Sequence, residues 1–215
     1  MTIFINKTAI LFLKIGEHLF ISTFALLLGA TIAIPLGILL SKSKVGSGIA
    51  LAVSSILQTS PSLALLAIII PFLGIGKLPA IIALCTYSLL PIVRNTLLGM
   101  KYISFNILDA SKGMGLKSSQ ILLQVQLPLA LPVIMSGVRL SAVYVISWAT
   151  IASYIGAGGL GDYIFSGLNT FSIELVLMGA IPVTILALVV DFLMSKLERA
   201  VLPRTSSNIT GGMSK

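Results

Sequence analysis

Long runs of apolar residues constrain this chain more than any other feature of its sequence. A helix that crosses a bilayer needs about 20 mostly apolar residues. Five runs meet that length, and they are Leu19–Leu40, Ile49–Phe72, Leu78–Leu98, Val133–Ile155 and Leu175–Met194. Only 9% of the residues are charged, whereas a soluble domain typically has about 25%. The sequence therefore predicts an all-α integral membrane protein with five transmembrane helices.

The basic residues predict the orientation of these helices, because membrane proteins concentrate Lys and Arg in their cytoplasmic loops. With the N-terminus outside, ten of the 14 Lys and Arg residues lie inside, and Arg139 lies within the fourth helix. We therefore expect an N-out, C-in protein. Residues 1–18 form an external or interfacial segment, residues 19–200 the transmembrane domain, and residues 201–215 a disordered cytoplasmic tail. This distribution accounts for the net charge of +8 without a nucleic-acid partner.

The chain offers few residues for catalysis or metal binding. Its one cysteine, Cys85, and its one histidine, His18, cannot form a metal-ligand cluster, and we expect His18 to lie at the membrane interface. The spacing G-x-G-x-x-G occurs at residues 156–161, but a dinucleotide site requires a strand–turn–helix unit around it. No Walker A sequence is present, so we expect no nucleotide cofactor in this chain.

The longest predicted cytoplasmic segment, about residues 99–132, has a helical pattern of apolar residues that a simple connecting loop does not require. Apolar residues recur at helical spacing on both sides of Gly113 and Gly115. This pattern predicts two short amphipathic helices joined by a glycine turn. We expect Leu127-Pro128 and Pro132 to end the second helix before the fourth span begins.

This segment also contains a motif with defined spacing. It begins Asp109-Ala110-Ser111, reaches Gly115 after three residues, and ends nine residues later with Val125-Gln126-Leu127-Pro128. It resembles the EAA loop of bacterial ABC importer permeases, although Asp109, Ser111 and Val125 replace the usual Glu, Ala and Ile. The resemblance implies a type I importer permease fold and a coupling loop on which an ATPase docks. The implied coupling residues are Asp109, Ala110, Ser111, Gly113, Gly115, Leu127 and Pro128.

The resemblance extends over about residues 20–200. The runs Gln58–Ala64, Leu89–Thr96 and Ile155–Asp162 are similar to those of osmoprotectant permeases, which import glycine betaine, carnitine or choline. Methionine-importer permeases share the glycine-rich run, so methionine or another small solute is the alternative cargo. We expect residues 156–162 to form a flexible external turn that faces a substrate-binding protein. The candidate receptor-facing residues are Gly156, Gly158, Gly159, Gly161 and Asp162.

Polar and aromatic residues inside the spans are candidates for the transport path. Gln58, Thr59 and Ser60 precede Pro61 in an otherwise apolar run, and they either face the path or bond to another helix. A second set could make cation–π contacts with a quaternary ammonium, or could serve only in packing and interfacial anchoring. This set is Tyr87, Tyr144 and Trp148.

The family builds its path between two permeases, so the resemblance implies several partners in a bacterial cytoplasmic membrane. These are a second permease, identical or homologous, two ATP-binding subunits that hold ATP and Mg²⁺, and an external or lipid-anchored substrate-binding protein. The expected mechanism is alternating access without covalent chemistry. A self-sufficient secondary transporter is the competing class, but the sequence contains neither an acidic pair in mid-membrane nor an inverted repeat that we detect.

Overall fold

The computed structural model describes residues 2–59 and 62–201, and the regular structure in these ranges is helical. The elements are α1 (Thr2–Ser41), α2 (Lys44–Thr59), α3 (Ser62–Leu73), α4 (Lys77–Lys101), α5 (Phe105–Gly113), α6 (Ser118–Gln120), the π-helical turn η1 (Ile121–Gln126), α7 (Leu127–Ala152), the 3-10 turn η2 (Ser153–Ile155), α8 (Gly161–Asn169) and α9 (Ile173–Val201).

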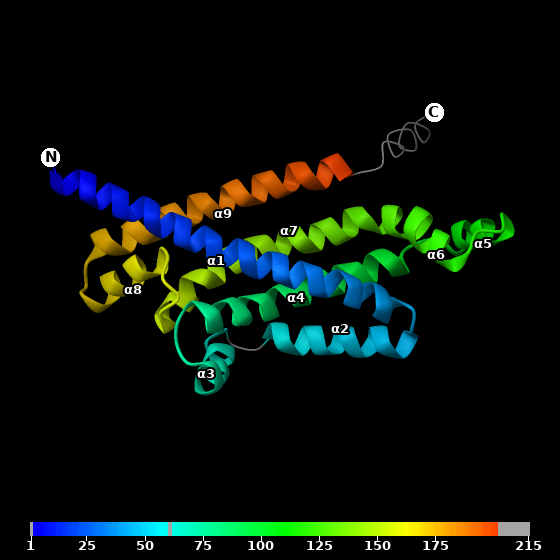
Figure 1. Ribbon diagram of the computed structural model, residues 1–215, viewed down its shortest axis with the longest axis horizontal. Coiled ribbons are helices and arrows are strands. Elements are labelled where there is room, and N and C mark those ends of the chain that lie inside the picture. The colour runs from blue at the N-terminus through cyan, green and yellow to red at the C-terminus, as the bar shows by residue number, and fades with distance from the viewer. Residues whose placement is uncertain (1, 60–61, 202–215) are drawn as a thin grey trace, which may run out of the picture.

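The long helices α1, α4, α7 and α9 run along the long axis of the molecule (Figure 1). Helix α4 packs against both α1 and α7, α9 packs against α7, and α2 lies along α4. The α5–α6 loop is at one end of the molecule, and α8 with the start of α1 is at the other (Figure 1). Lysine residues lie at both ends of the molecule. Lys42 and Lys112 line one hollow at the α5 end. At the opposite end, Lys14 and Lys77 both pair with the carboxylate of Glu17.

Four helical segments are long and apolar enough to cross a membrane, within the described ranges. They are Ala9–Ser41, Lys77–Lys101, Ser118–Ile155 and Ile173–Val201. The predicted second span is described as two helices, since α2 ends at Thr59, α3 begins at Ser62, and Ser60 and Pro61 fall outside the described residues. Pro61 stands between them in the sequence, and proline disfavours a continuous helix because it lacks a backbone N–H.

Two other helix boundaries differ from the predicted ones. Helix α1 has 40 residues and begins at Thr2, so its length of about 60 Å exceeds the roughly 30 Å hydrocarbon layer. The expectation that Leu127-Pro128 and Pro132 end the loop helix is wrong, because the helix continues through η1 into α7. Pro128 is the second residue of α7, directly after the π-helical turn. The N–H of Leu127 bonds to the carbonyl of Leu122, so a wider turn accommodates the entry.

Small residues of α1 set how closely it packs on α4. Gly29, Ala33 and Gly37 recur every four residues and share one face of α1. A Cβ added at Gly37 would lie 2.7 Å from the Cβ of Thr96, and one at Gly29 would collide with the hydroxyl of Ser88. This small-xxx-small pattern lets two helix backbones approach in a lipid environment, where dispersion contacts drive helix association.

Helix α9 has a different environment. Among its residues, all of which the structure describes, only Gly179 is buried, and α9 contacts chiefly α7 and α8. A helix that is apolar on all sides and unburied within its own chain is suited to lipid or to another subunit.

Candidate functional site

The predicted coupling loop folds as two short helices around a glycine turn, as the sequence pattern predicts. Helix α5 ends at Gly113, and the amide of Met114 donates to the carbonyl of Ala110 at 3.0 Å. Gly115 then takes φ +79°, a left-handed conformation that residues with a Cβ resist. The next helix starts where the amide of Lys117 donates to the side-chain oxygen of Gln120 at 2.8 Å.

The loop presents most of its motif to solvent. Asp109 and Ala110 are exposed, and Pro128 is exposed at the start of α7, while Leu127 is half-buried. Ser111 is the exception, because it is only 3% exposed and its hydroxyl donates to the carbonyl of Ile107. We therefore interpret Ser111 as a residue that stabilises α5 from within, and not as a contact for a partner.

Large apolar side chains surround the exposed motif. Tyr102 is 77% exposed, Phe105 72% and Met114 72%. Apolar groups clustered on a polar end of a protein typically mark an interaction site. The arrangement provides an apolar surface with one carboxylate, Asp109, on a short helix that a soluble partner can reach.

The three predicted aromatic residues lie together. The ring centroids of Tyr87 and Trp148 are 3.9 Å apart, and those of Tyr144 and Trp148 are 5.7 Å apart with planes 28° from parallel. Tyr87 is buried under Trp148, whereas Tyr144 is exposed on α7. Of the other predicted path residues, Ser60, Pro61 and the side chains of Gln58 and Thr59 fall outside the described residues.

The glycine-rich outer segment, residues 156–161, is packed against the helices, contrary to the expected flexible turn. Gly156, Gly158 and Gly159 have φ angles of +81°, +82° and +87°. The amide of Gly76 donates to the carbonyl of Ile155 at 2.9 Å, which joins the segment to the start of α4. Gly159 and Gly161 are buried, so they are not available for direct contact with a receptor, while Gly156 is exposed.

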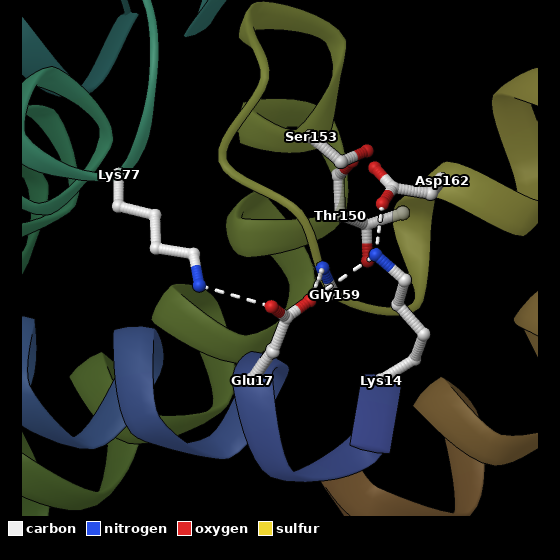
Figure 2. Close-up of polar contacts among 7 residues, drawn as sticks. All are labelled: Lys14, Glu17, Lys77, Thr150, Ser153, Gly159 and Asp162. Atoms are coloured by element: carbon white, nitrogen blue, oxygen red, sulfur yellow. Dashed lines mark hydrogen bonds and ion pairs between the residues drawn. The ribbon is translucent and has the colours of Figure 1, made fainter. Parts of the chain in front are cut away.

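An ion-pair network holds this segment to α1 (Figure 2). The carboxylate of Glu17 accepts from Lys77 at 2.9 Å, from Lys14 at 3.2 Å and from the amide of Gly159 at 3.3 Å. Lys14 also donates to Asp162 at 2.6 Å. Residues from α1, α4, α8 and the glycine-rich segment therefore meet at one point.

His18 is the next residue after Glu17 of this network, and its side chain is buried between helices. The side chain is buried at 1% exposure, and its Nε2 donates to the carbonyl of Ile146 at 3.0 Å. Neighbouring side chains of a helix point in different directions, so Glu17 faces the ion pairs while His18 faces α7. His18 therefore helps to fasten α1 to α7.

A second charged cluster joins α7 to α9. Arg139 donates to both carboxylate oxygens of Asp191, at 2.7 and 2.9 Å, and to Glu198 at 3.2 Å. The sequence signal was one basic and one acidic residue inside two apolar runs, since intramembrane charges usually pair. The bidentate geometry shows that Arg139 is paired across the helix interface instead of reaching alone toward the membrane surface.

Within the described residues, no group of three or more His, Cys, Asp or Glu side chains is placed to hold a metal ion.

Known proteins resemble this chain over nearly its whole length. The family model described as a binding-protein-dependent transport system inner membrane component matches residues 21–203. The carnitine transport permease protein OpuCB of Listeria monocytogenes is 55% identical over 194 residues, which cover 90% of this chain and 89% of that protein. The glycine betaine/carnitine/choline transport system permease protein OpuCB of Bacillus subtilis is 51% identical over 191 residues, covering 89% and 88% of the two chains.

Solved structures agree on the fold. An inward-facing form of the MetNI methionine ABC transporter matches with a TM-score of 0.79 and 24% identity, over 91% of this chain and 98% of that chain. An amino acid ABC transporter matches with a TM-score of 0.74 and 18% identity, over 92% and 96% of the two chains. At these identities the likeness shows the type I importer permease fold alone.

Proposed function

Because the chain belongs to the binding-protein-dependent transport system inner membrane component family, we propose that it is the permease subunit of an importer for quaternary amine osmoprotectants. Relatives named for carnitine, glycine betaine and choline transport are 50–55% identical to it over nearly nine-tenths of its length. The cargo is therefore a small solute with a permanently charged trimethylammonium group. The chain itself performs no covalent step.

The observation that carries the proposal is the exposed coupling loop. It sits at the end of the molecule where Lys42 and Lys112 lie, which the distribution of basic residues assigns to the cytoplasm. Its motif residues Asp109 and Ala110, together with exposed Phe105 and Met114, form a surface for a soluble ATPase. Two such ATPases, one for each permease of a pair, supply the energy.

A continuous helix connects this loop to the opposite end of the molecule. Residues Ser118–Ile155 form one helical segment of 38 residues, about 57 Å long at 1.5 Å per residue. It begins at the docking loop and ends at the glycine-rich outer segment. Movement of a docked ATPase would therefore tilt a rigid helix whose far end carries the receptor-facing surface, which is the physical basis for alternating access.

The aromatic cluster is the proposed contact for the cargo within the membrane. Tyr144 is exposed on α7 and its ring stacks on Trp148. An aromatic face attracts a quaternary ammonium by about 0.5–2 kcal/mol, enough for transient contact without trapping the solute. A second permease, packed against the unburied faces of this one, would complete the path, and a substrate-binding protein would deliver the solute from outside.

The test is uptake by the reconstituted complex. The permease is assembled in proteoliposomes with its partner permease, ATPase and substrate-binding protein, and ATP-dependent entry of labelled glycine betaine, carnitine, choline and methionine is measured. We expect uptake of at least one quaternary amine and none of methionine. Uptake of methionine alone would contradict the cargo, and uptake without ATP would contradict the class of transporter.

The docking role is tested in the same vesicles. Combined substitution of Asp109, Ala110 and Gly115 should abolish co-purification of the ATPase while the permease still inserts into the membrane. Gly48→Ala is the matched control, because it lies in α2 near the same end and its added methyl group meets no atom. Normal uptake by the triple variant would refute docking at the loop.

A further inference from the structure

Four charged side chains at the outer end form a network around the glycine-rich segment (Figure 2). We infer that Lys14 and Glu17 of α1 are positioning residues, which hold this segment in the one conformation that a substrate-binding protein meets. The inference rests on the proposed function for the identity of the partner. It goes beyond it by assigning a role to residues that lie outside the glycine-rich segment and outside the transport path.

The network has matched charges and shared partners. Glu17 accepts from Lys14 and Lys77, and Lys14 also pairs with Asp162 on α8, so two cations face two anions. The side chains of Lys14, Glu17 and Asp162 are each about one-third exposed or less, at 28%, 33% and 34%. Partial removal from water strengthens charge-assisted hydrogen bonds relative to pairs on an open surface.

The glycine-rich segment depends on these contacts because it has few side chains of its own. A Cβ at Gly158 would lie 2.9 Å from the Glu17 carboxylate, and one at Gly159 would lie 3.0 Å from the His18 ring. The backbone therefore rests directly on α1, and the amide of Gly159 donates to Glu17. Glycine residues can adopt many backbone conformations, so contacts with residues outside the segment, here those of α1, are needed to select one.

The network reaches both sides of the segment. The segment begins after η2 at the end of α7 and leads into α8 through Asp162. Lys14 holds the α8 side, Glu17 holds the middle, and the Gly76 amide holds Ile155 on the α7 side. Exposed Tyr154 and Gly156 project from the part that remains accessible, so their presentation depends on α1.

The experiment compares Lys14→Met and Glu17→Gln with Lys44→Met in the complete complex. Lys44→Met is the matched control, because it removes a lysine of α2 for which no ion pair occurs among the described residues. A spin label on Tyr154→Cys, in a Cys85→Ser background, lies in η2 directly before the segment and reports the mobility of the chain that leads into it. The ATPase rate as a function of substrate-binding protein concentration reports its recognition.

We expect the label to be restricted in the parent protein and in Lys44→Met, and mobile in Lys14→Met and Glu17→Gln. The concentration of substrate-binding protein at half-maximal stimulation should rise by up to about fivefold, as expected for loss of a partly exposed ion pair. The rate without substrate-binding protein should stay the same, which a general folding defect would not allow.

Two results would overturn the inference. Unchanged label mobility in both variants would show that the network does not hold the segment. Increased mobility with an unchanged half-maximal concentration would show that the held conformation is irrelevant to the partner. Neither result would affect ATP-dependent uptake of a quaternary amine by the parent complex, so the proposed function is tested separately.

Discussion

Gly115 provides the sharpest test of the coupling loop, because its conformation can be perturbed without changing its packing. It has φ +79°, and a Cβ added there meets no atom within 4 Å. Gly113, two residues earlier, is equally open but lies at the end of α5 without a positive φ. The substitutions Gly115→Ala and Gly113→Ala therefore add the same methyl group to the same loop, and only the backbone conformation differs.

The expected magnitudes have opposite signs. Alanine in the left-handed region costs about 1–2 kcal/mol, which corresponds to roughly a 5- to 30-fold loss in the population of the native turn. Alanine at a helical position gains up to about 1 kcal/mol over glycine. We expect Gly115→Ala to weaken ATPase binding by about 5- to 30-fold, and Gly113→Ala to leave it unchanged or slightly stronger.

The assay is titration of the purified ATPase onto the permease in nanodiscs, with ATP-dependent uptake measured in parallel. Both variants should insert normally, because neither position lies in a transmembrane helix. Equal ATPase affinity in the two variants would refute the view that the left-handed turn at Gly115 shapes the docking surface. Weaker binding in Gly113→Ala alone would refute it as well.

Further predictions concern the membrane-embedded part. Gly37→Ala should lower the apparent unfolding temperature in detergent, since overpacking against Thr96 costs about 1–3 kcal/mol. Gly16→Ala in the same helix should not lower it, and equal unfolding temperatures would contradict close packing of α1 on α4. Arg139→Met should destabilise the protein because it leaves two carboxylates facing each other, and adding Asp191→Asn should recover part of the loss; strictly additive losses would argue against their coupling. A cysteine at Phe171, in a protein lacking Cys85, should react with an impermeant reagent from outside the cell, and labelling only after permeabilisation would reverse the predicted orientation.

The local features of the loop and the spans were predictable because each depends on residues close in sequence. The helix–turn–helix at residues 105–126 follows from apolar periodicity on both sides of Gly113 and Gly115, and the structure confirms it. The long apolar runs predicted α1, α4, α7 and α9, although α1 begins well before Leu19. Hydropathy alone does not separate α2 from α3, because both lie within one apolar run.

The remaining features require contacts between residues far apart in the chain. His18 and Gly159 meet although more than 100 residues separate them, and so do Lys14 and Asp162 at a separation of 148 residues. Local sequence could not reveal that the glycine-rich segment is fastened to α1. It likewise could not show that Arg139 reaches Asp191 on α9.

The sequence by itself determined that this chain lives in a bilayer, because its long apolar runs leave too few charges for a soluble fold. It also predicts a docking loop, because the loop motif is local. The tertiary structure alone decided which charged residues pair and which glycines are buried. Each apolar run favours lipid over water whatever the rest of the chain does. Ion pairs and close backbone approaches form only once α1, α4 and α7 have packed together.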